Sequence, residues 1–91
     1  MEKTVWKFSF TPDDDIEIDM PEGAQILTVQ IQFEQPCIWA LVDPKSKLKK
    51  KRFKLIGTGH PIEINDIVDY RYVGTFQLME GQLVFHLFER L

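Results

Sequence analysis

The sequence predicts an all-β fold, a compact antiparallel sandwich or a small barrel of seven to eight strands. Three observations support this fold class. Apolar residues recur at every second position over most of the chain, no segment has a sustained helical period, and turn residues separate the alternating segments at short intervals. The 91 residues are expected to form a single β domain spanning 1–91, because a composition that is 44% hydrophobic is sufficient for one packed core.

The segment on which the other strands are expected to pack is Pro36–Pro44, a nearly unbroken apolar run bounded by prolines. The run is too short for an ordinary helix, and in a strand its apolar side chains would point to both faces of the sheet. Both faces therefore need cover, which predicts an interior strand. Cys37 lies in this run and is interpreted as a buried, unreactive thiol.

Three strands are predicted before this run. Thr4–Phe10 alternates aromatic and polar residues, which predicts a half-buried strand. Ile16–Met20 is a short strand with an acidic outer face, expected at a sheet edge, where charge discourages unwanted pairing. Ala24–Phe33 follows a Pro-Glu-Gly turn and is expected to form an antiparallel hairpin with the interior strand. Its alternation places on one face Leu27, Val29, Ile31 and Phe33.

The chain after the interior strand begins with Pro44–Lys51, which has no apolar period and is predicted to be a basic loop. Arg52–Ile56 then resumes the alternation of a strand. Segments 70–78 and 83–88 also alternate, and Glu80-Gly81 between them predicts a hairpin turn. Gly74 within the first of these segments predicts a bulge or the close approach of another backbone. Strict alternation would place Arg71, Thr75 and Gln77 on the face opposite to Tyr72.

The charge of the chain is small overall but unevenly distributed. The formal net charge is −3, yet six of the fourteen acidic residues lie in segment 13–22 and seven of the eleven basic residues lie in segment 45–54. A domain with a net negative charge is not expected to bind nucleic acid in general. A local site for an anion is still compatible with this distribution.

Other features predict the setting of the protein. The first residues lack the apolar run of a secretion signal, no run approaches the roughly 20 residues of a membrane span, and one cysteine cannot form an internal disulfide. We therefore expect a cytoplasmic protein that does not interact with membranes. A domain of this size buries a limited core, so a homo-oligomer is also expected.

The most irregular segment, Gly57-Thr58-Gly59-His60-Pro61, is the first candidate for ligand binding. Two glycines at this spacing can take positive φ, so that successive backbone N–H groups converge on an anion such as phosphate. The lysine of a P-loop and the helix of a dinucleotide fingerprint are both missing here. A tight corner at a sheet edge is the alternative interpretation.

Further candidates lie on the predicted strands. Arg52 and Lys54 can attract phosphate, although a solvated basic loop is the alternative. Trp39 and Tyr72 each combine a ring with a polar end and can stack on a planar ligand, with core packing as the alternative. Two polar side chains of segment 70–78 can read the edge of that ligand or simply meet water. The candidate ligand-binding residues are Arg52, Lys54, Gly57, Thr58, Gly59, His60, Trp39, Tyr72, Thr75 and Gln77.

The residues available for catalysis are few. The chain has two histidines, one cysteine and no serine in a nucleophile elbow. The spacing of His60, His86 and the carboxylates resembles no metal-ligand pattern. We therefore expect a non-enzymatic protein with no catalytic residues, no metal site and no cofactor.

Five motifs together resemble a family of small uncharacterised bacteriophage and prophage proteins. They are GAQIL at 23–27, WALVDP at 39–44, GTGHP at 57–61, GTFQ at 74–77 and LVFHLFE at 83–89. Phages encode small non-enzymatic β proteins that capture the nucleotide signals of bacterial immune systems, often as oligomers. By analogy with these, the resemblance implies a protein that sequesters a nucleotide-derived immune signal. The alternative is a protein–protein interaction module that blocks or bridges a host or virion protein.

Overall fold

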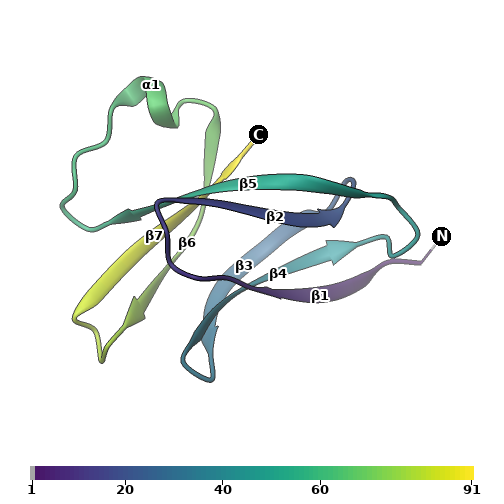
Figure 1. The fold of residues 1–91 in the computed structure, drawn as a ribbon, viewed down its shortest axis with the longest axis horizontal. Helices are drawn as coiled ribbons and strands as arrows, with labels where there is room; N and C mark the ends of the chain where they lie inside the picture. Colours follow the sequence, from purple (N-terminus) through teal and green to yellow (C-terminus); the bar gives the residue numbers. More distant parts are fainter. Residues whose placement is uncertain (1) are drawn as a thin grey trace.

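Seven strands form two antiparallel sheets in the computed structural model, which describes residues 2–91 (Figure 1). The predicted all-β fold is therefore confirmed as two packed sheets that do not close into a barrel. Sheet A has the order β1-β4-β3, with β1 at Thr4–Ser9, β4 at Gln35–Val42 and β3 at Gln25–Gln32. Sheet B has the order β2-β5-β7-β6, with β2 at Asp15–Pro21, β5 at Leu48–Gly57, β7 at Leu83–Arg90 and β6 at Tyr70–Leu78. A single helical turn, α1 at Ile64–Ile67, lies between β5 and β6.

The hydrophobic core lies between the two sheets. β4 is the central strand of sheet A, as predicted for the apolar run, and its Ile38, Ala40 and Val42 are buried against sheet B. Sheet B contributes the alternating side chains of its two central strands, including Phe53 and Leu87. The side chains that alternate with these along β5 and β7 point away from sheet A.

β3 departs from strict alternation at Leu27. The register of β3 with β4 shifts between Ile26 and Thr28, so Leu27 is an extra residue in a bulge. The prediction that Leu27 shares a face with Val29 and Ile31 is therefore wrong, because Leu27 is the bulge residue. Ile26 is buried with Val29, whereas Leu27 is 45% exposed and Phe33, in the turn after β3, is 92% exposed.

The basic loop predicted at Pro44–Lys51 is also wrong, because β5 begins at Leu48. The acidic residues of β2 explain this difference. Their register with β5 places Asp19 opposite Lys50, Glu17 opposite Arg52 and Asp15 opposite Lys54. Opposite charges on directly facing residues stabilise strand pairing, so this part of the basic run can form an extended strand.

β6 contains the irregularity predicted at Gly74. The register of β6 with β7 shifts between Tyr72 and Gly74, which makes Val73 a bulge residue. Gly74 also faces β3 closely, since a Cβ added there would lie 3.0 Å from Cγ1 of Val29. The bulge and the close approach therefore occur together, where the two sheets meet along β3 and β6.

Candidate functional site

Most of the predicted ligand-binding side chains meet on one surface, which we call the open face of sheet B, the face directed away from sheet A. Because Phe53, Leu55 and Leu87 point into the core, their neighbours along β5 and β7 point outward. The register then places side chains of all four strands on this face. Its central residues are Arg52, Lys54, Ile56, Tyr70, Tyr72, Thr75, Gln77, Val84, His86, Phe88 and Arg90.

The bulge at Val73 decides which side chains share the open face. Strict alternation would put Tyr72 and Thr75 on opposite faces, as the sequence predicted. The extra residue reverses the phase, so Tyr72 lies opposite Phe88 and Thr75 lies opposite His86. The predicted grouping of Arg71 with Thr75 is wrong for the same reason.

A chain of hydrogen bonds runs across this face. Oγ1 of Thr58 lies 2.6 Å from Nε2 of His86, and Oγ1 of Thr75 lies 2.8 Å from Nδ1 of the same ring. The hydroxyl of Tyr72 lies 2.6 Å from Oγ1 of Thr75. A neutral imidazole has one donor and one acceptor nitrogen, so one threonine donates to His86 and the other accepts from it.

Aromatic rings and a cation flank these polar groups. The rings of Tyr72 and Phe88 meet edge to face with centroids 5.6 Å apart. Nζ of Lys54 lies 5.6 Å from the centroid of the Tyr70 ring. The same ammonium donates a hydrogen bond to Oδ1 of Asp15 at 2.9 Å, and this bond, with the negative charge of Asp15, raises the pKa of Lys54 above its usual value.

The glycine loop forms a closed corner. The N–H of Thr58 donates to the carbonyl of Val84 at 3.1 Å, and the N–H of His60 donates to the carbonyl of Gly57 at 3.1 Å. Two of the amides predicted to converge on an anion are therefore already bonded within the protein. The alternative interpretation, a tight corner at the end of a strand, fits this geometry better, and Gly59 takes the positive φ of 85° that the turn requires.

Trp39 lies apart from the other candidates. It belongs to β4 and is paired with Lys7 and Thr28 on the neighbouring strands, on the side of sheet A that faces away from the core. Of the two rings proposed for stacking, only Tyr72 therefore lies with the other candidates. Two sheets separate the two rings.

Most of the basic run is paired with carboxylates. In addition to the Lys54–Asp15 pair, Nζ of Lys50 lies 3.4 Å from Glu17, and Nζ of Lys51 lies 3.0 Å from Glu89. Glu89 is buried and also contacts Arg71. The predicted basic patch is consequently much weaker than the number of lysines suggests.

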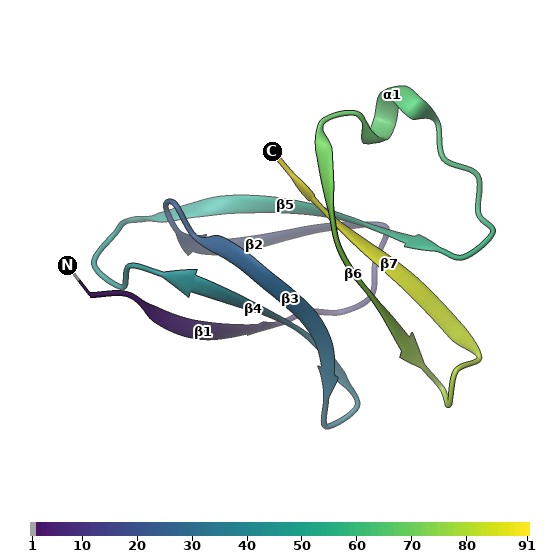
Figure 2. The ribbon, with the colours of Figure 1, turned by 180° about the vertical axis from the view of Figure 1, so that it is seen from behind.

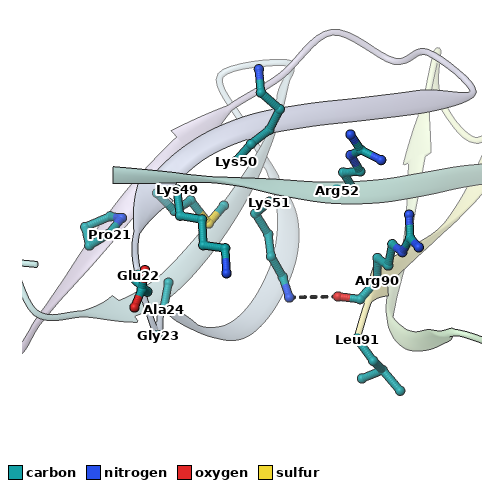
Figure 3. A pocket seen from close by; sticks show the side chains of 11 residues that line it. Pro21, Glu22, Gly23, Ala24, Lys49, Lys50, Lys51, Arg52, Arg90 and Leu91 are labelled. Carbon is teal, nitrogen blue, oxygen red and sulfur yellow. Dashed lines mark hydrogen bonds between the residues drawn. The ribbon is translucent and has the colours of Figure 1, made fainter. Parts of the chain in front are cut away.

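A cleft with a volume of about 520 Å³ lies at the start of β5 (Figure 3). Its walls come from the turn between β2 and β3, the first half of β5 and the end of β7. Lys51 extends across it and donates a hydrogen bond to the carbonyl oxygen of Arg90 at 2.8 Å. The lining residues are Met20, Pro21, Glu22, Gly23, Ala24, Lys49, Lys50, Lys51, Arg52, Arg90 and Leu91.

The sequence analysis did not assign His86, Phe88 or Arg90 to a ligand site. A signal for them was present, because a turn centred on Glu80-Gly81 sets the hairpin register and brings β7 opposite Thr75 and Tyr72. The charged cleft had no comparable signal. It depends on where β7 ends relative to β5, which alternation does not reveal.

Residues 2–91 contain neither a cluster of metal ligands nor a membrane-spanning helix. No group of three or more His, Cys, Asp or Glu side chains there is arranged to hold a metal ion. None of the helical structure in that range is long and apolar enough to cross a membrane.

Comparison with known proteins gives a family match. The family described as "Domain of unknown function (DUF7352)" matches residues 1–91. No curated protein and no solved structure matches the sequence.

Proposed function

The chain belongs to the DUF7352 family, and we propose that it is a non-enzymatic binding protein that sequesters a nucleotide-derived signal on the open face of sheet B. One observation carries this proposal. The hydrogen-bonded side chains of Thr58, His86, Thr75 and Tyr72 lie beside an aromatic pair and next to Arg52 and Lys54 on one exposed sheet surface.

The aromatic pair suits a planar ring. Tyr72 is 53% exposed, and its edge-to-face contact with Phe88 holds its ring in place before any ligand arrives. Stacking of a nucleobase on such a ring contributes about 1–3 kcal/mol. Substitution of Tyr72 should therefore weaken binding of a nucleotide substantially.

The polar chain suits the edge of a base. Thr58, Thr75 and His86 can exchange donor and acceptor roles by rotating hydroxyl groups and shifting the imidazole proton. Gln77 follows Thr75 on the same face and adds an amide with both kinds of group. Such a surface can match a base edge with little rearrangement of the backbone.

The same contacts favour binding over catalysis. Both ring nitrogens of His86 are within hydrogen-bond distance of threonine hydroxyls, and no carboxylate among residues 2–91 hydrogen-bonds to that ring. A nucleophile–base pair is ordinarily oriented by such a third group. In this proposal the protein is phage-encoded, acts in the cytoplasm of the bacterial host and lowers the concentration of a defence signal without consuming it.

Isothermal titration against cyclic dinucleotides, cyclic trinucleotides and ADP-ribose derivatives tests the proposal. We expect at least one of them to bind, and Tyr72→Ala to weaken that binding by about tenfold or more, since stacking contributes about 1–3 kcal/mol. Phe33→Ala is the matched control, because Phe33 is an exposed aromatic residue in the turn after β3. Absence of heat for the whole panel at every salt concentration would exclude the proposal.

A specific observation also favours the alternative, an interaction module. The β3–β4 and β6–β7 turns project from the same end of the molecule (Figures 1 and 2). Their Phe33 and Met79 are 92% and 65% exposed, and both take φ of 51°, a conformation that is costly for bulky residues. A host protein retained stoichiometrically by the wild type, but lost with Phe33→Ser and Met79→Ser together, would support this function.

A further inference from the structure

We propose that the cleft at the start of β5 is a site for a ligand with two or more phosphates. The cleft exists because the strands differ in extent. β5 begins at Leu48, but its ladder with β7 begins only at Phe53, which pairs with Glu89. Residues 48–52 therefore lie beyond this ladder, without a β7 partner, and leave a notch beside β5. Lys49 and Lys51 border this notch from one side of β5, and Lys50 and Arg52 extend to the other side (Figure 3).

The notch has an excess of positive charge. Five basic residues and one acidic residue line it. The acidic residue, Glu22, lies 3.8 Å from Nζ of Lys47, which is outside the lining, so its charge is partly offset there. Lys50 is paired with Glu17 on the other side of β5.

Three of these basic residues have no carboxylate within salt-bridge distance among residues 2–91. They are Lys49 and Arg52 on β5 and Arg90 at the end of β7, and all three are exposed. In contrast, Lys54 forms an ion pair with Asp15. In the glycine loop, the N–H groups of Thr58 and His60 already donate hydrogen bonds to carbonyl groups of the protein. The strongest positive potential is therefore expected in the first half of β5, five to eight residues before the predicted anion loop, or roughly 17–26 Å along the strand.

Lys51 has a different role in the cleft, since it holds the walls together. Its Nζ lies 3.0 Å from the buried carboxylate of Glu89 and 2.8 Å from the carbonyl oxygen of Arg90. These contacts fix the end of β7 against β5 and so fix the backbone from which the Arg90 side chain extends. A guanidinium can bind phosphate oxygens in a bidentate manner, which a lysine ammonium cannot do.

The volume and charge together indicate the class of ligand. About 520 Å³ lies in the range of small-molecule pockets, and three unpaired cations match a diphosphate or triphosphate better than a single phosphate. Arg52 lies two residues before Lys54 on β5, and Arg90 lies two residues after Phe88 on β7. Two residues correspond to about 7 Å along a strand. On the proposed function, on which this step rests, phosphates in the notch would place the attached ring near Tyr72 and Phe88.

Titration with inorganic tripolyphosphate and pyrophosphate tests the notch without any nucleotide. We expect tripolyphosphate to bind more tightly than pyrophosphate, and binding to weaken between 50 and 300 mM NaCl because exposed charges are screened. Lys49→Gln, Arg52→Gln and Arg90→Gln should each weaken binding by roughly tenfold, the loss typical of one charged hydrogen bond. Lys45→Gln is the matched control, since Lys45 is exposed in the loop before β5 and outside the notch.

The outcomes separate this inference from the proposed function. If tripolyphosphate fails to bind, or if Lys45→Gln weakens it as much as Arg52→Gln does, the notch is not a specific site. If a nucleotide binds through Tyr72 but is unaffected by Lys49→Gln and Arg90→Gln, the proposed function stands and the notch inference is wrong. If tripolyphosphate depends on the notch and no nucleotide of the panel binds at any salt concentration, the notch stands and the proposed function fails. Unchanged thermal melting of each variant shows that it is folded.

Discussion

Replacement of Gly74 by alanine tests the contact that joins the two sheets. Gly74 does not have positive φ, so its backbone conformation allows an alanine. The added Cβ would lie 3.0 Å from Cγ1 of Val29, which is 3% exposed and packed in the core. A buried β-branched side chain has few other rotamers to adopt, so the strain must be taken up by a shift between β3 and β6.

The expected magnitude follows from two opposing effects. Overpacking of a core costs about 1–3 kcal/mol. Replacement of glycine restricts the unfolded chain and recovers about 0.4–1 kcal/mol. We therefore expect Gly74→Ala to lower the free energy of unfolding by about 1–2 kcal/mol.

A double-mutant cycle in urea identifies the cause. Val29→Ala alone should cost about 2 kcal/mol because it removes two buried methyl groups. In that background the clashing atom is absent, so adding Gly74→Ala should be neutral or slightly stabilising. If the two substitutions instead add within about 0.5 kcal/mol, the steric explanation is wrong.

Three further predictions concern charge and turn geometry. Lys51→Met should lower the free energy of unfolding by about 1–2 kcal/mol, because the buried carboxylate of Glu89 then has only Arg71 as its ion-pair partner. An unchanged midpoint in urea titration would contradict this role of Lys51. The pKa of Lys54 is raised in the folded state, so its ion pair with Asp15 stabilises the fold below the unfolded value near 10.5 and is lost as pH rises above it. Between pH 9 and 12 the wild type should therefore lose more stability than Lys54→Met, by less than about 1 kcal/mol because the pair is largely exposed, and equal losses would refute this. Gly59→Ala should lower the free energy of unfolding by about 1–2 kcal/mol, because the φ of Gly59 is 85°. Gly57→Ala should lower it less, since the added Cβ meets only the exposed His60 ring. The reverse order of stability in thermal melts would contradict the turn geometry.

The strands could be predicted from the sequence because most of them bury one face, and a period of two reports that directly. The edge position of β2 and the interior position of β4 followed from charge and apolarity in the same way. The two bulges could be predicted only in part. Gly74 marked one of them, but Leu27 is an ordinary strand residue, and its type does not indicate the extra position.

The candidate site shows a different limit of sequence patterns. The types of residue were predictable, and Arg52, Lys54, Tyr72, Thr75 and Gln77 do share one face. The predicted faces were wrong, since alternation placed Tyr72 and Thr75 on opposite faces and only the bulge brings them onto the same one. His86, which touches both Thr58 and Thr75, was missed because its position depends on pairing between strands.

The distribution of charge shows why a basic segment does not by itself indicate an anion site. The acidic segment 13–22 and the basic segment 45–54 are far apart in the sequence, but β2 and β5 are neighbours and their charges face each other. Pairing of this kind cancels part of the local potential, because Lys50 is paired with Glu17 and Lys54 with Asp15. The positive charge that is not paired depends on strand lengths. Lys49, Arg52 and Arg90 all lie near the point where β5 continues past its ladder with β7.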